Sequence, residues 1–395
     1  MSVGWNIYVP LSVVMFLEFA VWGAWAPVLA ARLLGPLGMS GKQAGWIYAT
    51  LPIACIISPL VAGQLADQFF NVEWILAAAH LIGGILLFLA VKRTTFPSLL
   101  GVMFAYSLCY AATLPLVNSA LFNHVKDGPT QAKVFIWAPV AWALVGYALS
   151  GWRVLRKGEG DGSDCLVFAG VLSLVTALCC LKLPASPPQA TGEIPLLKTL
   201  EMLRQPDFLV FILISLFVSG MMQFYFLGSA RYLMERGVSG KAVPASMAIA
   251  QAAQAIATLA ALGPVRDYLG FRWTLAAGAA CWAVLYLFYV ATAPRGLLIA
   301  AQVLHGLAYV MFMIVGQIYA EEVAPPAIRS SMQGLIFAAT IGVGSFVGTQ
   351  MAGVVMDAFS REGRFQWAKI WSVPLVVVLL GVVALATIFE GQVPK

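Results

Sequence analysis

Glu18 is the clearest ionisable residue inside a long apolar stretch, in the sequence VVMFLEFAVWGAW at residues 13–25. A charge at the centre of a bilayer costs about 2.5–3.5 kcal/mol, so a carboxylate in such a stretch indicates a function. Trp22 and Trp25 follow at helical spacing on the same face. We expect Glu18 to face a water-accessible cavity and to carry a proton, because burial disfavours its charged form. The alternative is a hydrogen-bonded Glu18 that ties its helix to neighbouring helices.

A second polar set lies in an apolar stretch near residue 305, where Gln302, His305 and Tyr309 recur close to one helical face. An imidazole ionises near neutral pH, so His305 is a candidate for proton transfer or for a hydrogen bond to a solute. A histidine packed in the core is the alternative. We interpret His80, in a different apolar stretch, as structural.

Amide and aromatic side chains recur in the remaining apolar stretches. An amide that faced lipid would leave its donors and acceptors unpaired, so these groups are expected to point inward. There they would bind a solute or join helices, and aromatic rings could stack on a flat ring. The candidates for solute binding are Trp22, Trp25, Tyr110, Asn118, Gln223, Tyr225, Gln251, Gln254 and Tyr309.

The composition places most of the chain in lipid. Of 395 residues, 61% are hydrophobic and 10% are charged, and the mean hydropathy is +0.88. About 25% of the residues of a soluble globular domain are charged. The net charge of +6 comes from scattered basic residues, which gives no reason to expect a nucleic-acid partner. Because no nucleotide-binding loop, zinc-ligand spacing or nucleophile motif is found, we expect neither a cofactor nor a metal, and we do not expect an enzyme.

Apolar stretches long enough to span a bilayer predict an all-α membrane protein with twelve transmembrane helices. A segment rich in Pro, polar and charged residues, 184–206, separates two six-helix bundles at 1–183 and 207–395, and we expect it to be a cytoplasmic linker. The predicted spans are 7–33, 44–66, 73–92, 98–122, 134–152, 165–183, 207–233, 243–264, 273–293, 297–319, 331–356 and 370–389.

Two sequence echoes relate the halves. LAARLLGPLGMSGK at Leu29–Lys42 agrees with GSARYLMERGVSGK at Gly228–Lys241 in seven of fourteen positions. A Gly-x-x-x-Asp motif then recurs in nearly the same register, as Gly63 with Asp67 and as Gly263 with Asp267. Parallel repeats of this kind predict a pseudo-two-fold axis along the membrane normal, the arrangement of the major facilitator fold. The motif resembles the conformational loop of that superfamily, in which the glycine allows helices to approach and the carboxylate can cap a helix.

Longer motifs resemble the bacterial nucleoside:proton symporter family over nearly the whole chain. They are FLEFAVWGAWAPVL, ISPLVAGQLADQFFNVEWILAAAHLIGGILLF, TLPLVNS and APPAIRSSMQGLIFAATIGVGSFVG. The resemblance implies a permease of the bacterial inner membrane that moves a nucleoside or a similar small polar solute by alternating access. It assigns the family's glutamines to Gln223 and Gln251. Charged positions of the family read Gln254, Val310 and Phe135 here, so we expect Glu18, with His305, to supply the ionisable groups.

The sequence therefore predicts a secondary transporter of a small polar, nucleoside-like solute, coupled to protons. The alternative is an uncoupled facilitator or exporter of another small organic solute, such as a sugar, vitamin or drug-like compound. A membrane receptor is a third reading, which the two loop motifs disfavour. We expect a monomer in the lipid bilayer with both termini in the cytoplasm. The distribution of Lys and Arg favours the opposite orientation, because only nine of the 23 lie on the expected cytoplasmic side.

Overall fold

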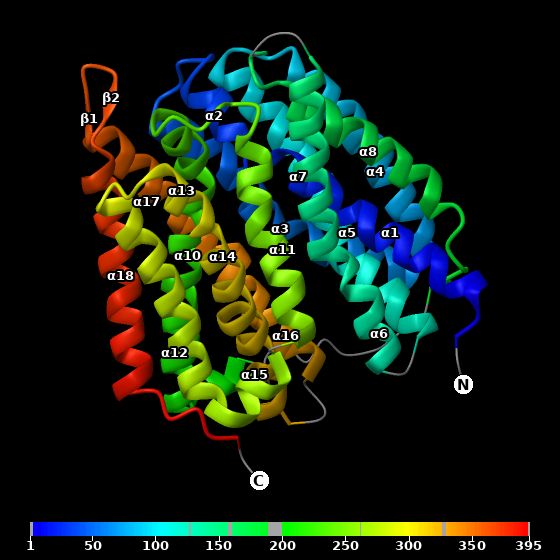
Figure 1. Cartoon of the computed structure of the whole chain (residues 1–395). Helices are drawn as coiled ribbons and strands as arrows, with labels where there is room; N and C mark the ends of the chain where they lie inside the picture. Colours follow the sequence, from blue (N-terminus) through cyan, green and yellow to red (C-terminus); the bar gives the residue numbers. More distant parts are fainter. Residues whose placement is uncertain are drawn as a thin grey trace. The chain divides into compact units, whose positions relative to one another are not determined.

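The computed structural model is almost entirely helical (Figure 1). It describes residues 3–125, 128–156, 160–188, 200–260, 262–325 and 329–393. Contacts divide the chain into two compact units. One comprises Met1–Met39, Trp46–Gly192 and Val238–Ala248, and the other comprises Ser40–Gly45, Glu193–Gly237 and Ile249–Lys395. Residues 189–199 of the predicted linker at 184–206 lie outside the described residues.

The first unit contains most of the helices of the N-terminal half together with residues 238–248, whereas the start of α3, up to Gly45, belongs to the second unit. In this unit α4 packs along both α5 and α8. α1 packs against α7 and α8. The helices are α1 (Trp5–Trp25), α2 (Leu29–Leu34), α3 (Gly41–Gln68), α4 (Val72–Val91), α5 (Phe96–His124), α6 (Gly128–Phe135), α7 (Trp137–Leu155) and α8 (Asp164–Cys180).

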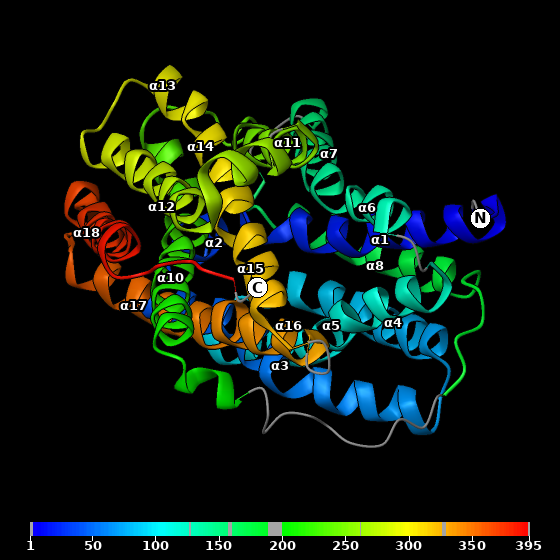
Figure 2. The ribbon, with the colours of Figure 1, turned by 90° about the horizontal axis from the view of Figure 1, so that it is seen from below.

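The second unit contains the helices of the C-terminal half and a short β-hairpin. α12 packs along α18, and α10 packs along α17, as both views show (Figures 1 and 2). Two segments, η2 and η4, are π-helical. The elements are η1 (Met202–Arg204), α10 (Pro206–Glu235), α11 (Val243–Ala260), α12 (Leu262–Val290), α13 (Arg295–Ala300), α14 (Gln302–Ala308), η2 (Tyr309–Ile314), α15 (Val315–Val323), α16 (Arg329–Phe337), η4 (Ala338–Gly344), α17 (Ser345–Ala358), β1 (Ser360–Arg361), β2 (Arg364–Phe365) and α18 (Trp367–Thr387).

The prediction of an all-α membrane protein is confirmed. Among the described residues, eleven helices are long and apolar enough to cross a membrane. The sixth predicted span, 165–183, corresponds to α8, which has 17 residues and is shorter than these eleven. The loop predicted between the eighth and ninth spans is partly helical, because α12 already begins at Leu262 and is kinked at Gly270, where φ is 69°. Glycine tolerates this left-handed conformation, so the kink falls there.

The first sequence echo has a structural reason. Gly38 and Gly237 occupy equivalent positions of the repeat, and both have positive φ, at 59° and 84°. A residue with a side chain rarely adopts this conformation, so both copies retain glycine. Two residues later, Ser40 and Gln43 form a capping box, in which each side chain bonds to the other residue's backbone nitrogen. The echo therefore encodes the turn that leads from the first long helix of each half to the second.

Asp357 caps the first turn of α3. Its carboxylate oxygens accept hydrogen bonds from the backbone nitrogens of Gly41 (2.5 Å) and Lys42 (3.0 Å). We expect Asp357→Ala to lower the free energy of unfolding by about 1 kcal/mol, the usual cost of a lost cap. Thermal melting in detergent micelles measures the change. Asp267→Ala is the matched control, because Asp267 is exposed and bonds to the adjacent Arg266. Equal losses in the two variants would contradict a capping role for Asp357.

Candidate functional site

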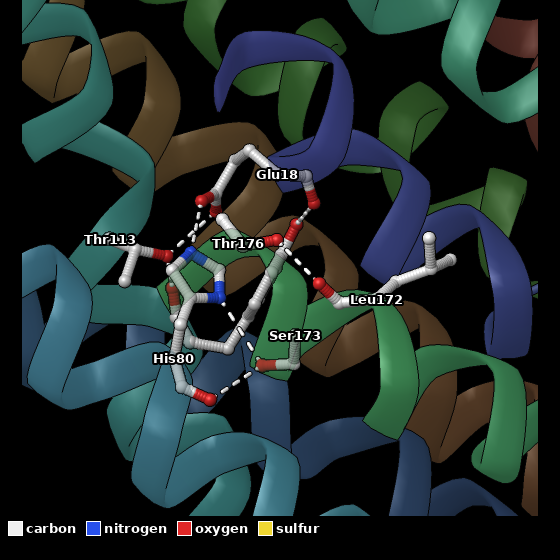
Figure 3. A network of polar contacts seen from close by, with 7 residues as sticks. Glu18, His80, Thr113, Leu172, Ser173 and Thr176 are labelled. Carbon is white, nitrogen blue, oxygen red and sulfur yellow. Dashed lines mark hydrogen bonds and ion pairs between the residues drawn. The ribbon is translucent and has the colours of Figure 1, made fainter. Parts of the chain in front are cut away.

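The carboxylate of Glu18 lies at the centre of a buried polar network in the first unit (Figure 3). Its side chain is 0% exposed, two turns before the C-terminal end of α1. Oε2 is 2.7 Å from Nε2 of His80 on α4. Oε1 accepts a hydrogen bond of 2.7 Å from the hydroxyl of Thr113 on α5. Both oxygens of the carboxylate therefore have partners inside the bundle.

Two further hydroxyl groups hold this network in place. The Tyr110 hydroxyl donates to the backbone oxygen of Glu18 at 2.8 Å. The Ser173 hydroxyl on α8 donates to the backbone oxygen of His80 at 2.8 Å and lies 3.3 Å from Nδ1 of the same histidine. Side chains from α1, α4, α5 and α8 thus meet around one carboxylate. Every polar atom of the His80 ring is engaged, as the cost of burying an unpaired polar group requires.

The two tryptophans predicted to share a face with Glu18 have different surroundings. Trp25 is 1% exposed and donates its indole N–H to the hydroxyl of Tyr106 at 3.1 Å. Trp22 is half-buried and makes edge contacts with Tyr110 and with Trp142, at ring-centroid distances of 6.2 and 5.4 Å. The indole N–H of Trp25 is therefore engaged within the bundle, whereas part of the Trp22 ring stays accessible.

Asn118 lies on α5, two turns after Tyr110. It is half-buried, and its amide oxygen is buried with no hydrogen-bond partner within the described ranges. An unpaired buried acceptor is costly, so this oxygen is available for a donor from another molecule.

In the second unit, His305 is fully buried between aromatic rings. Its imidazole stacks on Tyr225 with ring centroids 3.9 Å apart and an interplanar angle of 17°. The indole N–H of Trp282 lies 3.1 Å from Nδ1. An indole nitrogen can only donate, so Nδ1 carries a lone pair and the neutral ring carries its hydrogen on Nε2. Nε2 is buried and has no hydrogen-bond partner among the residues that the structure describes.

Gln302 fixes the ring on which His305 stacks. Its amide oxygen accepts from the Tyr225 hydroxyl at 2.7 Å, and its amide nitrogen donates to the Tyr289 hydroxyl at 2.8 Å. The Tyr225 hydroxyl is therefore engaged within the protein, and only its ring remains for packing. Tyr309 is half-buried and is the first residue of the π-helical segment η2. Such π-helical turns often occur at functional sites.

The three predicted glutamines of the second unit all point away from solvent. Gln223, Gln251 and Gln254 are 8%, 9% and 8% exposed. The Gln223 amide nitrogen donates to the Ser345 hydroxyl at 3.0 Å, which joins α10 to α17. Its amide oxygen is thus the part of Gln223 with capacity for a further donor.

The structure describes only part of the predicted conformational loops. The side chain of Asp67 lies outside what it describes, and Gly263 lies in the first turn of α12. Gly63 has nothing within 4 Å of the position that a Cβ atom would occupy. Asp267 is exposed and pairs with Arg266 at 3.0 Å, and Arg266 also reaches Glu322 at 3.3 Å.

The contact between His80 and Glu18 is not visible in the sequence around either residue. His80 is 62 residues away from Glu18 in sequence, and no local spacing connects the two. The only available signal was an imidazole in a stretch expected to lie in lipid, where ionisable groups usually pair with one another. In the described part of the chain, no group of three or more His, Cys, Asp or Glu side chains could hold a metal ion.

Comparisons with known proteins agree with this architecture. The sequence profile of the family described as "Nucleoside H+ symporter" matches residues 5–393. YegT of Escherichia coli is 30% identical over 391 residues, which cover 94% of this chain and 91% of YegT. The nucleoside permease NupG of Escherichia coli is 25% identical over 386 residues, covering 93% of this chain and 92% of NupG.

Solved structures share the fold. The crystal structure of the nucleoside transporter NupG superposes with a TM-score of 0.85 at 22% identity, over 98% of this chain and 99% of that one. The crystal structure of a D-xylose-proton symporter gives a TM-score of 0.75 at 15% identity, and both chains are covered completely. The prediction of a major facilitator fold is therefore confirmed.

Proposed function

Because the chain belongs to the nucleoside H+ symporter family, we propose that it moves nucleosides across the bacterial inner membrane together with protons. It is a multi-pass secondary transporter and not an enzyme. The observation that carries the proton-coupled mechanism is the fully buried carboxylate of Glu18 inside a membrane-spanning helix. An ionisable group is costly in that position, so its presence there indicates a function in transport.

We assign the proton-coupling role to Glu18. Its carboxylate is held by hydrogen bonds that tolerate both protonation states, because Thr113 donates and the imidazole of His80 can donate or accept. His305 takes a different part in this proposal. A neutral imidazole with a free Nε2–H presents one donor, which suits a hydrogen bond to an oxygen of the solute.

Recognition of the solute is assigned to polar and aromatic side chains of each unit. A nucleoside has a flat base, which can stack on aromatic rings, and a sugar whose hydroxyls bond to amides. In the second unit, Gln223, Gln251 and Gln254 are buried amides. The residues proposed to bind the solute are Trp22, Trp25, Tyr110 and Asn118 in the first unit and Gln223, Tyr225, Gln251, Gln254 and Tyr309 in the second. The conformational change is assigned to the loop residues Gly63, Asp67, Gly263 and Asp267.

The proposed arrangement in the membrane has both termini in the cytoplasm, a monomeric chain, and two halves, 1–183 and 207–395, joined by the linker at 184–206. The family resemblance supports the orientation, and the count of Lys and Arg opposes it. Fluorescence of a green fluorescent protein fused to the C-terminus tests it, because that protein fluoresces only when it folds in the cytoplasm.

Binding and proton flux on the purified protein test the proposed function. We expect a nucleoside at a hundred times its dissociation constant to stabilise the protein by about 2.7 kcal/mol in a thermal-shift assay. Sugars, vitamins and amino acids are the controls and should have no effect. In proteoliposomes, adding the same nucleoside should move protons in the direction of the solute, which a pH-sensitive dye reports.

Two results would change the proposal. Stabilisation by a sugar or vitamin, and not by nucleosides, would replace the substrate and keep the fold. Nucleoside flux without any proton movement would favour the uncoupled facilitator or exporter.

A further inference from the structure

We propose that Glu18 and His80 together form the proton-carrying site, holding one shared proton that is loaded and released by the pair as a unit. This inference rests on the proposed function, in which the chain couples its solute to protons. It adds His80 as a second ionisable member and Ser173 as the residue that positions it. The number of hydrogen atoms available in the network determines which atoms donate and which accept (Figure 3).

Ser173 determines which nitrogen of His80 carries a fixed hydrogen. The serine hydroxyl has one hydrogen, and it donates this hydrogen to the backbone oxygen of His80 at 2.8 Å. Toward Nδ1, at 3.3 Å, the same oxygen can therefore only accept. Nδ1 must then carry a hydrogen, and Nε2 is the nitrogen that changes its protonation state.

The short contact between Nε2 of His80 and Oε2 of Glu18 requires a proton between them. At 2.7 Å, two bare lone pairs would repel each other, so one partner donates. Either a neutral imidazole accepts from the carboxylic acid, or an imidazolium donates to the carboxylate. Both arrangements contain one mobile proton and have zero net charge. The described structure is accordingly the loaded, neutral form of the pair.

Unloading leaves a charge of −1 on the pair. When the shared proton is transferred to water, the carboxylate of Glu18 faces the unprotonated Nε2 of His80 across the same contact. Thr113 can compensate in part, because its hydroxyl lies 2.7 Å from Oε1 and 2.6 Å from the backbone oxygen of Tyr110 and can donate its single hydrogen to either. Repulsion at the Nε2–Oε2 contact remains, so proton loss favours separation of α1 from α4. Reprotonation from water restores the neutral contact.

The titratable groups around the pair do not compensate the charge of −1 that proton loss leaves on it. The titratable groups that face it are Tyr106 and Tyr110 on α5 and Cys180 on α8. Cys55 on α3 lies beyond Tyr110. All four are ordinarily neutral at physiological pH. Within the part of the chain that the structure describes, His80 is the one basic side chain in ion-pair distance of Glu18. Only the shared proton therefore neutralises the carboxylate.

Variants of His80 test the pair in the full-length protein. Uptake of a nucleoside into proteoliposomes is measured against pH for the wild type, His80→Gln, Glu18→Gln and the double variant. We expect His80→Gln to lower uphill uptake at least tenfold at neutral pH and to move the midpoint of the pH profile by more than one unit. In the exchange of internal for external nucleoside, which Glu18→Gln retains, adding His80→Gln should cause no further loss, since residues that act as one site are not additive.

Ser107→Ala is the matched control. It removes a buried hydroxyl of α5 that bonds to Thr50 at 2.9 Å, outside the pair. We expect it to keep the wild-type pH midpoint even if it lowers the melting temperature. An unchanged midpoint in His80→Gln, or a further loss of exchange when His80→Gln is added to Glu18→Gln, would overturn the shared proton and leave His80 as a packing residue.

Infrared spectroscopy separates failure of this inference from failure of the proposed function. The carboxylic acid band that disappears in Glu18→Gln is followed against pH in the purified wild type and in a folded His80 variant, either His80→Gln or His80→Asn. A pH transition that shifts on loss of the imidazole supports the shared proton, even if the wild type moves no protons. The same transition in both proteins overturns the inference, even if transport is proton-coupled.

Discussion

Glu18→Gln is expected to abolish the accumulation of nucleoside against its gradient while leaving exchange of internal for external nucleoside intact. A proton gradient of one pH unit drives about tenfold accumulation when one proton accompanies each solute molecule. Glutamine has the shape of glutamate and can still accept from Thr113 through its amide oxygen, so the network is retained. It cannot release a proton, so the solute should only equilibrate. Proteoliposomes with an imposed pH gradient measure both activities.

Glu73→Gln is the control for this result. Glu73 is also a buried carboxylate of the first unit, at 7% exposure, but it bonds to the backbone nitrogen of Ser186 and to Asn71 and not to His80. We expect this variant to accumulate nucleoside normally. Wild-type accumulation by Glu18→Gln would remove Glu18 from the coupling mechanism. Loss of accumulation in both variants would mean that any buried carboxylate of this unit supports folding and not coupling.

The spans could be predicted because length and hydropathy are sufficient for a helix in lipid, where every backbone polar group must be bonded within the helix. Inward orientation of polar residues followed from the same constraint. Glu18 is 0% exposed and Gln254 is 8% exposed. Both agree with the expectation that polar side chains avoid lipid, where an unpaired polar group is costly. The sequence repeat pairs Gly38 with Gly237, and both glycines have positive φ in the structure.

The pairing of helices was not available from the sequence. Hydropathy gives each helix an inward face but does not identify the helix that packs on it, so the contact of His80 with Glu18 could not be predicted. For the same reason Trp25, which shares a helical face with Glu18, proved to be bonded to Tyr106. The kink at Gly270 and the π-helical segment that begins at Tyr309 depend on tertiary packing and not on the local pattern.

The crossing of α10 and α17 depends on glycines that allow two backbones to touch. A Cβ atom on Gly348 would clash with the backbone oxygen of Gly220, and one on Gly220 would lie 2.7 Å from the backbone oxygen of Gly344. Gly344 and Gly348 are four residues apart, the small-xxx-small spacing that permits close packing of membrane helices. Backbone atoms cannot move aside as a flexible side chain can, so the contact has no room for a methyl group.

Gly348→Ala is therefore expected to lower the free energy of unfolding by about 3 kcal/mol, near the upper end of the usual cost of overpacking. Gly101→Ala is the control, because Gly101 is exposed on α5 with nothing within 4 Å of its Cβ position; it should melt at or above the wild-type temperature. The Gly348 contact also sets the distance between Gln223 and Ser345, each three residues from a glycine of the crossing. Any folded Gly348→Ala protein should thus bind nucleoside more weakly, whereas wild-type melting and affinity would show that the helices can separate without cost.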